Sequence, residues 1–166
     1  MPGIDKNEFI ELFRQMYGPV RNFVYYKTSD GGLADDITQD TFAKIWEMKS
    51  KIRNDTVKSL LYKIAGNLCI NQLEKKQVRF EFANQYRQNG SVVSPEFELE
   101  FKEFDERLQR ALESLKEKDR VVFLMNRIDR LTYSQIADSL GLSVKAVEKR
   151  MKNALDELKK VIEYNI

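Results

Sequence analysis

The chain has 166 residues, of which 42% are hydrophobic, and it carries a formal net charge of only +2 at pH 7. This length is enough for one compact domain or two small ones. No apolar run approaches the length that crosses a bilayer, and the N-terminus lacks the basic start and apolar run of a signal peptide. Because its single cysteine, Cys69, excludes an internal disulfide, we expect a cytoplasmic protein.

The composition also limits the chemistry that is possible. The chain has no histidine, which together with a single cysteine excludes zinc sites and His-dependent catalytic triads. It has no nucleotide-binding glycine loop. We therefore expect no enzyme, no cofactor, no metal and no small-molecule substrate. A free-standing DNA-binding protein is usually more basic, so any binding to DNA is expected to need a partner.

The first half of the chain predicts three amphipathic helices, because apolar residues recur there at three- and four-residue intervals. A bend is expected in the first helix at Gly18-Pro19, where proline removes an amide donor. The helices are expected over residues 5–27, 34–49 and 57–77.

Acidic residues crowd the first turns of the second predicted helix, where Gln39 accompanies Asp35, Asp36 and Asp40. Carboxylates at this end complement the helix dipole, which is the simplest interpretation. They can also form an acidic surface for a partner protein. A magnesium site is not expected, because neighbouring side chains on a helix diverge and no phosphate-binding loop accompanies them.

The third predicted helix combines amides, cations and an aromatic ring. Such a set suits single-stranded nucleic acid, whose bases stack on rings and expose their edges. A solvated helix face is the alternative interpretation. The residues concerned are Lys58, Tyr62, Lys63, Asn67, Asn71 and Lys75.

The apolar pattern fades after residue 78, and we expect a linker over residues 79–93 between domains at 1–78 and 94–166. Ser94 and Pro95 then predict the cap and first position of a helix whose opening is acidic. A broadly hydrophobic helix is expected over residues 117–129, at the centre of the second domain.

Two short helices joined by a glycine are predicted after residue 131. Thr132 and Gln135 have capping-box spacing, Gly141 ends the first helix, and Ser143 caps the second. This is the helix-turn-helix pattern, in which the second helix enters the major groove. An ordinary helical hairpin is the alternative. Residues expected to face inward are Val147, Met151, Ala154, Leu155 and Leu158; those expected on the outer, polar face are Lys145, Lys149, Lys152 and Asn153.

Three blocks in this order resemble the extracytoplasmic-function sigma factors, the small two-domain specificity subunits of bacterial RNA polymerase. A-D-D-I-T-Q-D-T-F-A-K-I-W resembles their core-binding helix, and S-L-L-Y-K-I-A-G-N-L-C-I-N-Q-L their minus-ten helix. L-T-Y-S-Q-I-A-D-S-L-G-L-S-V-K-A-V-E-K-R-M-K-N-A-L resembles their minus-thirty-five reader. The resemblance implies an all-α fold, with an N-terminal domain of three to four helices and a C-terminal domain of four.

The resemblance also implies site residues and partners. The clamp of the largest polymerase subunit would be bound by Asp35, Asp36, Gln39, Asp40, Phe42 and Ile45. The unpaired promoter strand would be held by Lys63, Asn67 and Asn71, with residues 54–58 shaping a pocket for one flipped base. The upstream promoter element would be contacted by Lys145, Lys149, Arg150, Lys152 and Asn153. An anti-sigma factor, often membrane-anchored, would be a further partner.

Two other functions stay open on the sequence. A free-standing helix-turn-helix regulator would bind specific DNA without polymerase, with a steep dependence on salt. A sigma-like adaptor would instead bind an anti-sigma factor and no polymerase; Glu74 and Ala146, which depart from common residues of the family, keep this possibility open.

Overall fold

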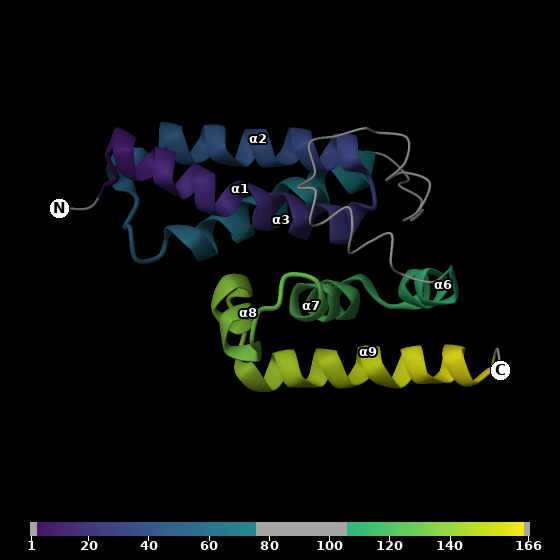
Figure 1. Cartoon of the computed structure of the whole chain (residues 1–166). Coiled ribbons are helices and arrows are strands. Elements are labelled where there is room, and N and C mark those ends of the chain that lie inside the picture. The colour runs from purple at the N-terminus through teal and green to yellow at the C-terminus, as the bar shows by residue number, and fades with distance from the viewer. Residues whose placement is uncertain (1–2, 76–105, 165–166) are drawn as a thin grey trace.

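The computed structural model describes residues 3–75 and 106–164; for 73–75, 106–109 and 162–164 it describes the course of the helix alone. Every regular element in these residues is helical, which confirms the predicted all-α class (Figure 1). The elements are α1 (Lys6–Thr28), α2 (Gly31–Glu47), the short 3₁₀ helix η1 (Lys49–Lys51), α3 (Val57–Lys75), α6 (Glu106–Ser114), α7 (Glu117–Arg127), α8 (Tyr133–Leu140) and α9 (Val144–Tyr164). The predicted linker and the Ser94-Pro95 helix start lie outside the described residues.

Helices α1, α2 and α3 pack against one another and form what we call the N-terminal bundle. Helix α1 begins at a capping box, in which the Glu8 amide donates to Asp5 and the Asp5 amide donates to Glu8. It continues as one helix to Thr28 with Pro19 inside it, so Pro19 does not end the helix. Val20, Ile45 and Leu61, one from each helix, are fully buried at the centre.

Helices α6 to α9 form the C-terminal bundle, and α7 is its central element. Helix α7 packs against both α8 and α9, and every residue from Asp119 to Met125 is buried. This agrees with the expectation from its broadly hydrophobic sequence. Leu112, Ile136 and Met151 complete the core from the other three helices. Leu155 departs from its prediction: it is 41% exposed, because α9 presents a narrower apolar stripe than the helical wheel indicated.

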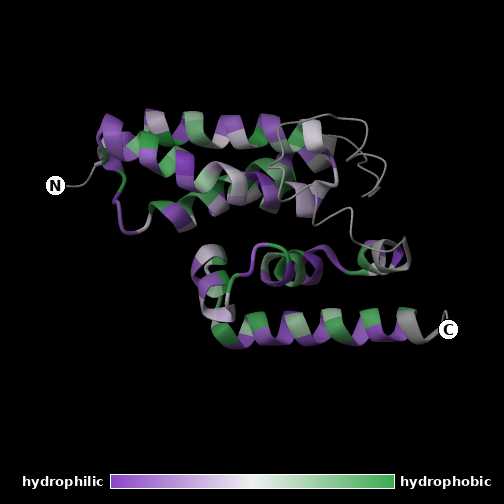
Figure 2. Ribbon diagram, in the orientation of Figure 1, coloured by the Kyte–Doolittle hydropathy of each residue, from purple (hydrophilic) through white to green (hydrophobic). Residues whose placement is uncertain are grey.

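The two bundles lie against each other rather than apart. Helix α1 packs on α7 and helix α3 packs on α8, so that the bundles form two layers (Figure 1). Apolar residues concentrate between the helices within each layer, while polar residues cover the outer faces (Figure 2). Among the described residues, no helix is both long enough and apolar enough to cross a membrane.

The predicted capping box at the start of α8 is present. The Gln135 amide donates to the Thr132 hydroxyl at 3.1 Å, and the Thr132 amide donates to the Gln135 side chain at 2.9 Å. We expect Thr132→Ala to lower the free energy of unfolding by about 1 kcal/mol, since an N-cap hydroxyl contributes that much. Urea unfolding followed by circular dichroism measures this loss. Thr132→Ser keeps the acceptor and should stay within a few tenths of a kcal/mol of the parent; an equal loss in both variants would contradict the capping explanation.

Candidate functional site

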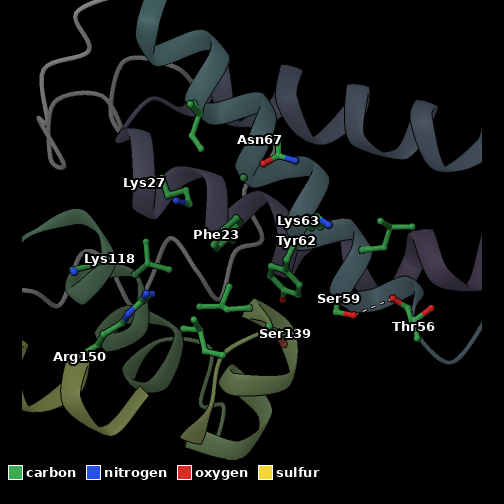
Figure 3. A pocket seen from close by; sticks show the side chains of 17 residues that line it. Phe23, Lys27, Thr56, Ser59, Tyr62, Lys63, Asn67, Lys118, Ser139 and Arg150 are labelled. Carbon is green, nitrogen blue, oxygen red and sulfur yellow. Dashed lines mark hydrogen bonds between the residues drawn. The ribbon is translucent and has the colours of Figure 1, made fainter. Parts of the chain in front are cut away.

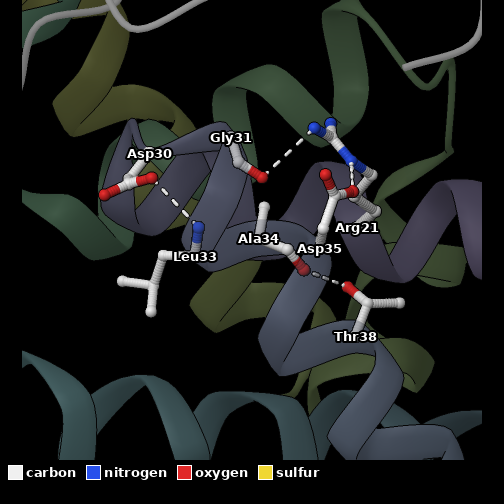
Figure 4. Close-up of polar contacts among 7 residues, drawn as sticks. All are labelled: Arg21, Asp30, Gly31, Leu33, Ala34, Asp35 and Thr38. Carbon is white, nitrogen blue, oxygen red and sulfur yellow. Dashed lines mark hydrogen bonds and ion pairs between the residues drawn. The ribbon is translucent and has the colours of Figure 1, made fainter. Parts of the chain in front are cut away.

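The acidic start of α2 divides into one structural and several surface residues. Asp30 caps the helix by accepting from the Leu33 amide, and Asp35 points inward to the buried guanidinium of Arg21, at 2.5 Å (Figure 4). The Arg21 side chain is only 2% exposed and also donates to the Gly31 carbonyl. Asp36 and Asp40 are exposed, as is Gln39. Asp35 therefore holds α2 on α1, while the other three residues form an exposed strip, which we call the acidic strip.

The structure does not support surface roles for Phe42 and Ile45. Phe42 is 3% exposed and Ile45 is fully buried, because both lie on the face of α2 that packs within the bundle. Phe42 meets the rings of Phe13, at 5.0 Å between centroids, and of Tyr17, at 6.0 Å. Their side chains stabilise the fold and are not available to a partner.

An exposed aromatic patch beside the acidic strip was missed by the sequence reasoning. We define this aromatic patch as Phe13, Tyr17 and Trp46; Phe13 is 40% exposed, Trp46 is 38% exposed and Tyr17 is half-buried. The rings of Phe9 and Phe42 connect Trp46 to the other two. Tyr17 joins the patch to the strip, because its hydroxyl lies near the Gln39 side chain. Burial and the nearby carboxylate of Asp35 raise the pKa of Tyr17. The sequence carried a signal for this patch, because Trp46 lies seven residues, or about two helical turns, after Gln39 and therefore on the same face of α2.

The polar residues predicted on α3 are partly exposed and partly covered. The side chains of Lys58, Lys63, Asn67 and Asn71 are exposed on α3. Tyr62, expected to offer its ring to a base, is only 3% exposed: it packs edge-on against Phe23 at 5.2 Å, and the Ser139 side chain of α8 lies near its hydroxyl. Burial and the charge of Asp129 raise the pKa of Tyr62 well above its usual range. The side chain of Lys75 lies outside the described part of α3.

The turn between α8 and α9 has the predicted helix-turn-helix geometry. Gly141 ends α8 in the left-handed conformation, with φ of 67°, and the Ala146 amide donates to the Ser143 hydroxyl at 3.1 Å. Four of the residues predicted for DNA are exposed on α9: Lys145, Lys149, Lys152 and Asn153. Arg150 is half-buried instead and turns toward the N-terminal bundle.

A cavity of about 710 Å³ lies between α3 and the helix-turn-helix (Figure 3). Its walls include Tyr62 and Asn67 on one side and Gly141 on the other. Among the described residues that line it, none carries a carboxylate, and the cations are Lys27, Lys63, Lys118 and Arg150. The cavity is thus a positively charged space at the junction of the two bundles. No cluster of three potential metal ligands occurs in the described residues.

Two family models match the chain, one over the N-terminal bundle and one over the C-terminal bundle. "Sigma-70 region 2" matches residues 12–79 and "Sigma-70, region 4" matches residues 105–158. The ferric citrate uptake sigma factor FecI of Escherichia coli is 30% identical over 152 residues, which cover 89% of this chain and 87% of that protein. The chain belongs to the extracytoplasmic-function group of sigma-70 family sigma factors. This sigma factor directs transcription initiation by RNA polymerase and is not an enzyme.

Other comparisons agree with this membership. The RNA polymerase sigma factor YlaC of Bacillus subtilis is 29% identical over 155 residues, covering 90% of this sigma factor and 89% of YlaC. Among solved structures, CnrH in complex with the cytosolic domain of CnrY aligns with a TM-score of 0.67 and 22% identity, over 98% of this chain and 92% of that one. RpoE of Bartonella quintana, solved with the anti-sigma factor NepR, aligns with a TM-score of 0.61 and 18% identity, over 95% of this chain and 98% of that one. These two structures share the fold.

Proposed function

We propose that this sigma factor binds core RNA polymerase through the acidic strip of α2 together with the aromatic patch. The observation that carries the proposal is the sorting of side chains on one helix. The side chains that face the interior of the bundle are those of Asp35, Phe42 and Ile45. Those that stay exposed beside Trp46 are Asp36, Gln39 and Asp40. Rings at the centre of a patch with charged residues at its rim are the usual composition of an interface that binds strongly. A basic surface on the clamp of the largest subunit is the expected partner.

For the minus-ten element, we assign the exposed face of α3. Lys58 and Lys63 supply charge for the phosphates, while Asn67 and Asn71 supply amides for base edges. The Tyr62 ring belongs to this face as well, and it becomes available only when α8 moves away from it. Residues 54–58, at the N-terminus of α3, form the side on which a flipped base would be received.

For the minus-thirty-five element, we assign the outer face of α9. Ser143 fixes the start of this helix, and Lys145, Lys149 and Lys152 project from it into solvent. A helix of this kind fits the major groove, where its first two turns reach base edges and its lysines neutralise phosphates. Arg150 contributes only after the bundles separate, because it faces the cavity between them.

A reconstituted transcription reaction tests the proposal. Core polymerase, this sigma factor and sheared genomic DNA are incubated together, and the 5′ ends of the transcripts are sequenced. The proposal expects a set of start sites that share two upstream elements and that are absent without the sigma factor. If the protein binds such DNA tightly with no polymerase present, it is a free-standing regulator. If no start sites appear and core polymerase is not bound, the adaptor function takes its place.

The recognition helix gives a separate prediction. Lys149→Ala removes an exposed cation from the proposed DNA face, so we expect promoter use to fall by roughly fivefold and the salt dependence of DNA binding to lose about one phosphate contact. Lys160→Ala, on the same helix and paired with Glu157, is the matched control. Run-off transcription at several salt concentrations measures both variants, and native electrophoresis with core polymerase should show no change in either. Equal loss of core binding would contradict the surface assignment.

An anti-sigma factor is the further partner that we propose. Two of the similar solved structures are complexes with NepR and with the cytosolic domain of CnrY. A membrane-anchored inhibitor would hold this sigma factor at the cytoplasmic face of the membrane until released. The cytoplasm, where core polymerase and promoter DNA are found, is the proposed site of action.

A further inference from the structure

A short segment before α1 is hydrogen-bonded to the connection between α2 and α3. The Gly3 amide donates to the Ile52 carbonyl at 2.7 Å, and the Ile4 amide donates to the Lys49 carbonyl at 2.9 Å. Ile4 is 6% exposed and Ile52 is 3% exposed, so both belong to the core. We call residues 3–5 the strap, because its amides bond carbonyls at the two ends of η1. The strap lies at the end of the N-terminal bundle where α1 begins and α2 ends (Figure 1).

The backbone of Gly3 has a conformation that residues with a side chain rarely adopt. Its φ is 135°, and a Cβ placed on it would lie 3.4 Å from the carbonyl oxygens of Lys49 and Ser50. Glycine reaches a positive φ readily, whereas a Cβ strains the backbone there. We therefore expect Gly3→Ala to weaken the contact between the strap and η1.

The connection that the strap holds leads into a loop of four residues, 53–56, all of which are exposed. Within the loop, the Thr56 amide donates to the Arg53 carbonyl at 3.2 Å, and the Arg53 side chain pairs with Asp55 at 3.0 Å. The side chains of that pair are 70% and 63% exposed, and exposed ion pairs add little order. The position of the loop therefore depends on how firmly the buried Ile52 is held at its start.

Glu8 connects the first turn of α1 to the same loop. One oxygen of its carboxylate accepts from the Asp5 amide at 2.8 Å, as half of the capping box. The other oxygen accepts from the side-chain amide of Asn54 at 3.4 Å. This contact uses one N–H of the Asn54 amide, whose second N–H and carbonyl oxygen remain for the edge of a base. The capping box thus fixes the carboxylate that orients Asn54.

We propose that the strap and Glu8 position the loop of residues 53–56 and thereby set the base preference at one position of the minus-ten element, without touching the DNA. The inference rests on the proposed assignment of residues 54–58 to the flipped base. A flipped base is selected by the fit of its pocket. A loop that is free to move loses entropy on binding and adapts to more than one base, so it discriminates less. The strap and Glu8 are positioning residues, and Asn54 is the residue through which they act.

A promoter library transcribed by core polymerase with the full chain tests the strap. The library is built on a promoter found by sequencing 5′ ends, and each position of the minus-ten element carries all four bases in turn. Asn54→Ala identifies the position that the loop reads. We expect Gly3→Ala to lower the preference at that position by about fivefold, which is the lower end of what one base contributes, and to leave the other positions within about twofold of the parent. Gly18→Ala, where an added Cβ meets no atom within 4 Å, is the control and should keep every preference.

The contact of Glu8 with Asn54 is tested separately from the capping box. Glu8→Ala removes the acceptor of both the Asp5 amide and Asn54, whereas Asp5→Ala removes the acceptor of the Glu8 amide and keeps the contact with Asn54. We expect Glu8→Ala to lower the preference at the position read by the loop, and Asp5→Ala to keep the parental preference. An equal loss in both variants would attribute the effect to the stability of α1 and would contradict the positioning role of Glu8. Because each preference is a ratio within one variant, changes in core binding or in the amount of folded protein cancel.

The results also separate this inference from the proposed function. If Asn54→Ala changes a preference while Gly3→Ala and Glu8→Ala both leave it at the parental value, the inference is overturned and the assignment of the loop stands. A loss spread evenly over all positions would overturn it as well, because that result indicates a general defect in melting. If Asn54→Ala changes no position, the assignment of the loop to the flipped base is wrong, and the inference falls with it. The two variants act on different contacts, so one still gives the test if circular dichroism shows that the other is unfolded.

Discussion

Asp40→Lys should abolish transcription by this sigma factor while leaving its fold intact. Asp40 is exposed on the acidic strip, and no described contact within the chain depends on it, so its replacement costs the bundle little. At the interface, the new ammonium group would face the basic surface expected on the polymerase clamp. Reversing a charge in such a contact costs about 2–5 kcal/mol, which corresponds to a loss of at least about thirtyfold in affinity for core polymerase.

Competition for a limiting amount of core polymerase measures this effect directly. The variant is mixed with the parent protein, and transcription from a promoter of the parent is followed as the variant is increased. We expect no competition from Asp40→Lys and full competition from Glu11→Lys, which makes the same charge change on the exposed face of α1. Circular dichroism should give the same melting curve for the variant and the parent. If Asp40→Lys competes as well as the parent, the acidic strip is not the docking surface.

Asp35→Ala should have the opposite profile, a loss of stability without a specific loss of polymerase binding. Its carboxylate is 19% exposed and lies 2.5 Å from the guanidinium of Arg21, which is almost completely buried. Removing the carboxylate leaves a buried cation without its counter-charge, and such a change costs about 3 kcal/mol or more. For a chain of this size, that corresponds to a fall of roughly 6–12 °C in Tm.

The double variant Asp35→Ala with Arg21→Met separates charge from packing. Methionine fills much of the space of the arginine stem and carries no charge to desolvate, so we expect most of the lost stability to return. Thermal unfolding of the parent, the single variant and the double variant gives this comparison. Below its melting temperature, Asp35→Ala should still compete for core polymerase. Loss of competition in a folded Asp35→Ala protein would place this residue in the interface after all.

The start of α2 shows what could not be predicted from the sequence. The residues concerned are Asp35, Asp36, Gln39 and Asp40. Residue type and spacing placed them on one helix correctly, but they could not separate Asp35, which pairs with Arg21, from Asp40, which faces solvent. The partner of Asp35 is fourteen residues away on another helix, and helical periodicity carries no information about it. Phe42 and Ile45 were assigned to the polymerase-binding surface through the family resemblance, whereas the structure buries both residues. The aromatic patch beside them was missed.

The sequence by itself determined the features that depend only on residues within one or two helical turns. The capping box of Thr132 and Gln135, the left-handed Gly141, the Ser143 cap and the all-helical class follow from side chains that act on the backbone beside them. Only the tertiary structure decided the burial of Tyr62, the inward turn of Arg150 and the contact between the bundles. Asn22 and Asp129 meet across 107 positions of the chain, and the energy of such a contact depends on how two folded surfaces fit, which local pattern does not contain.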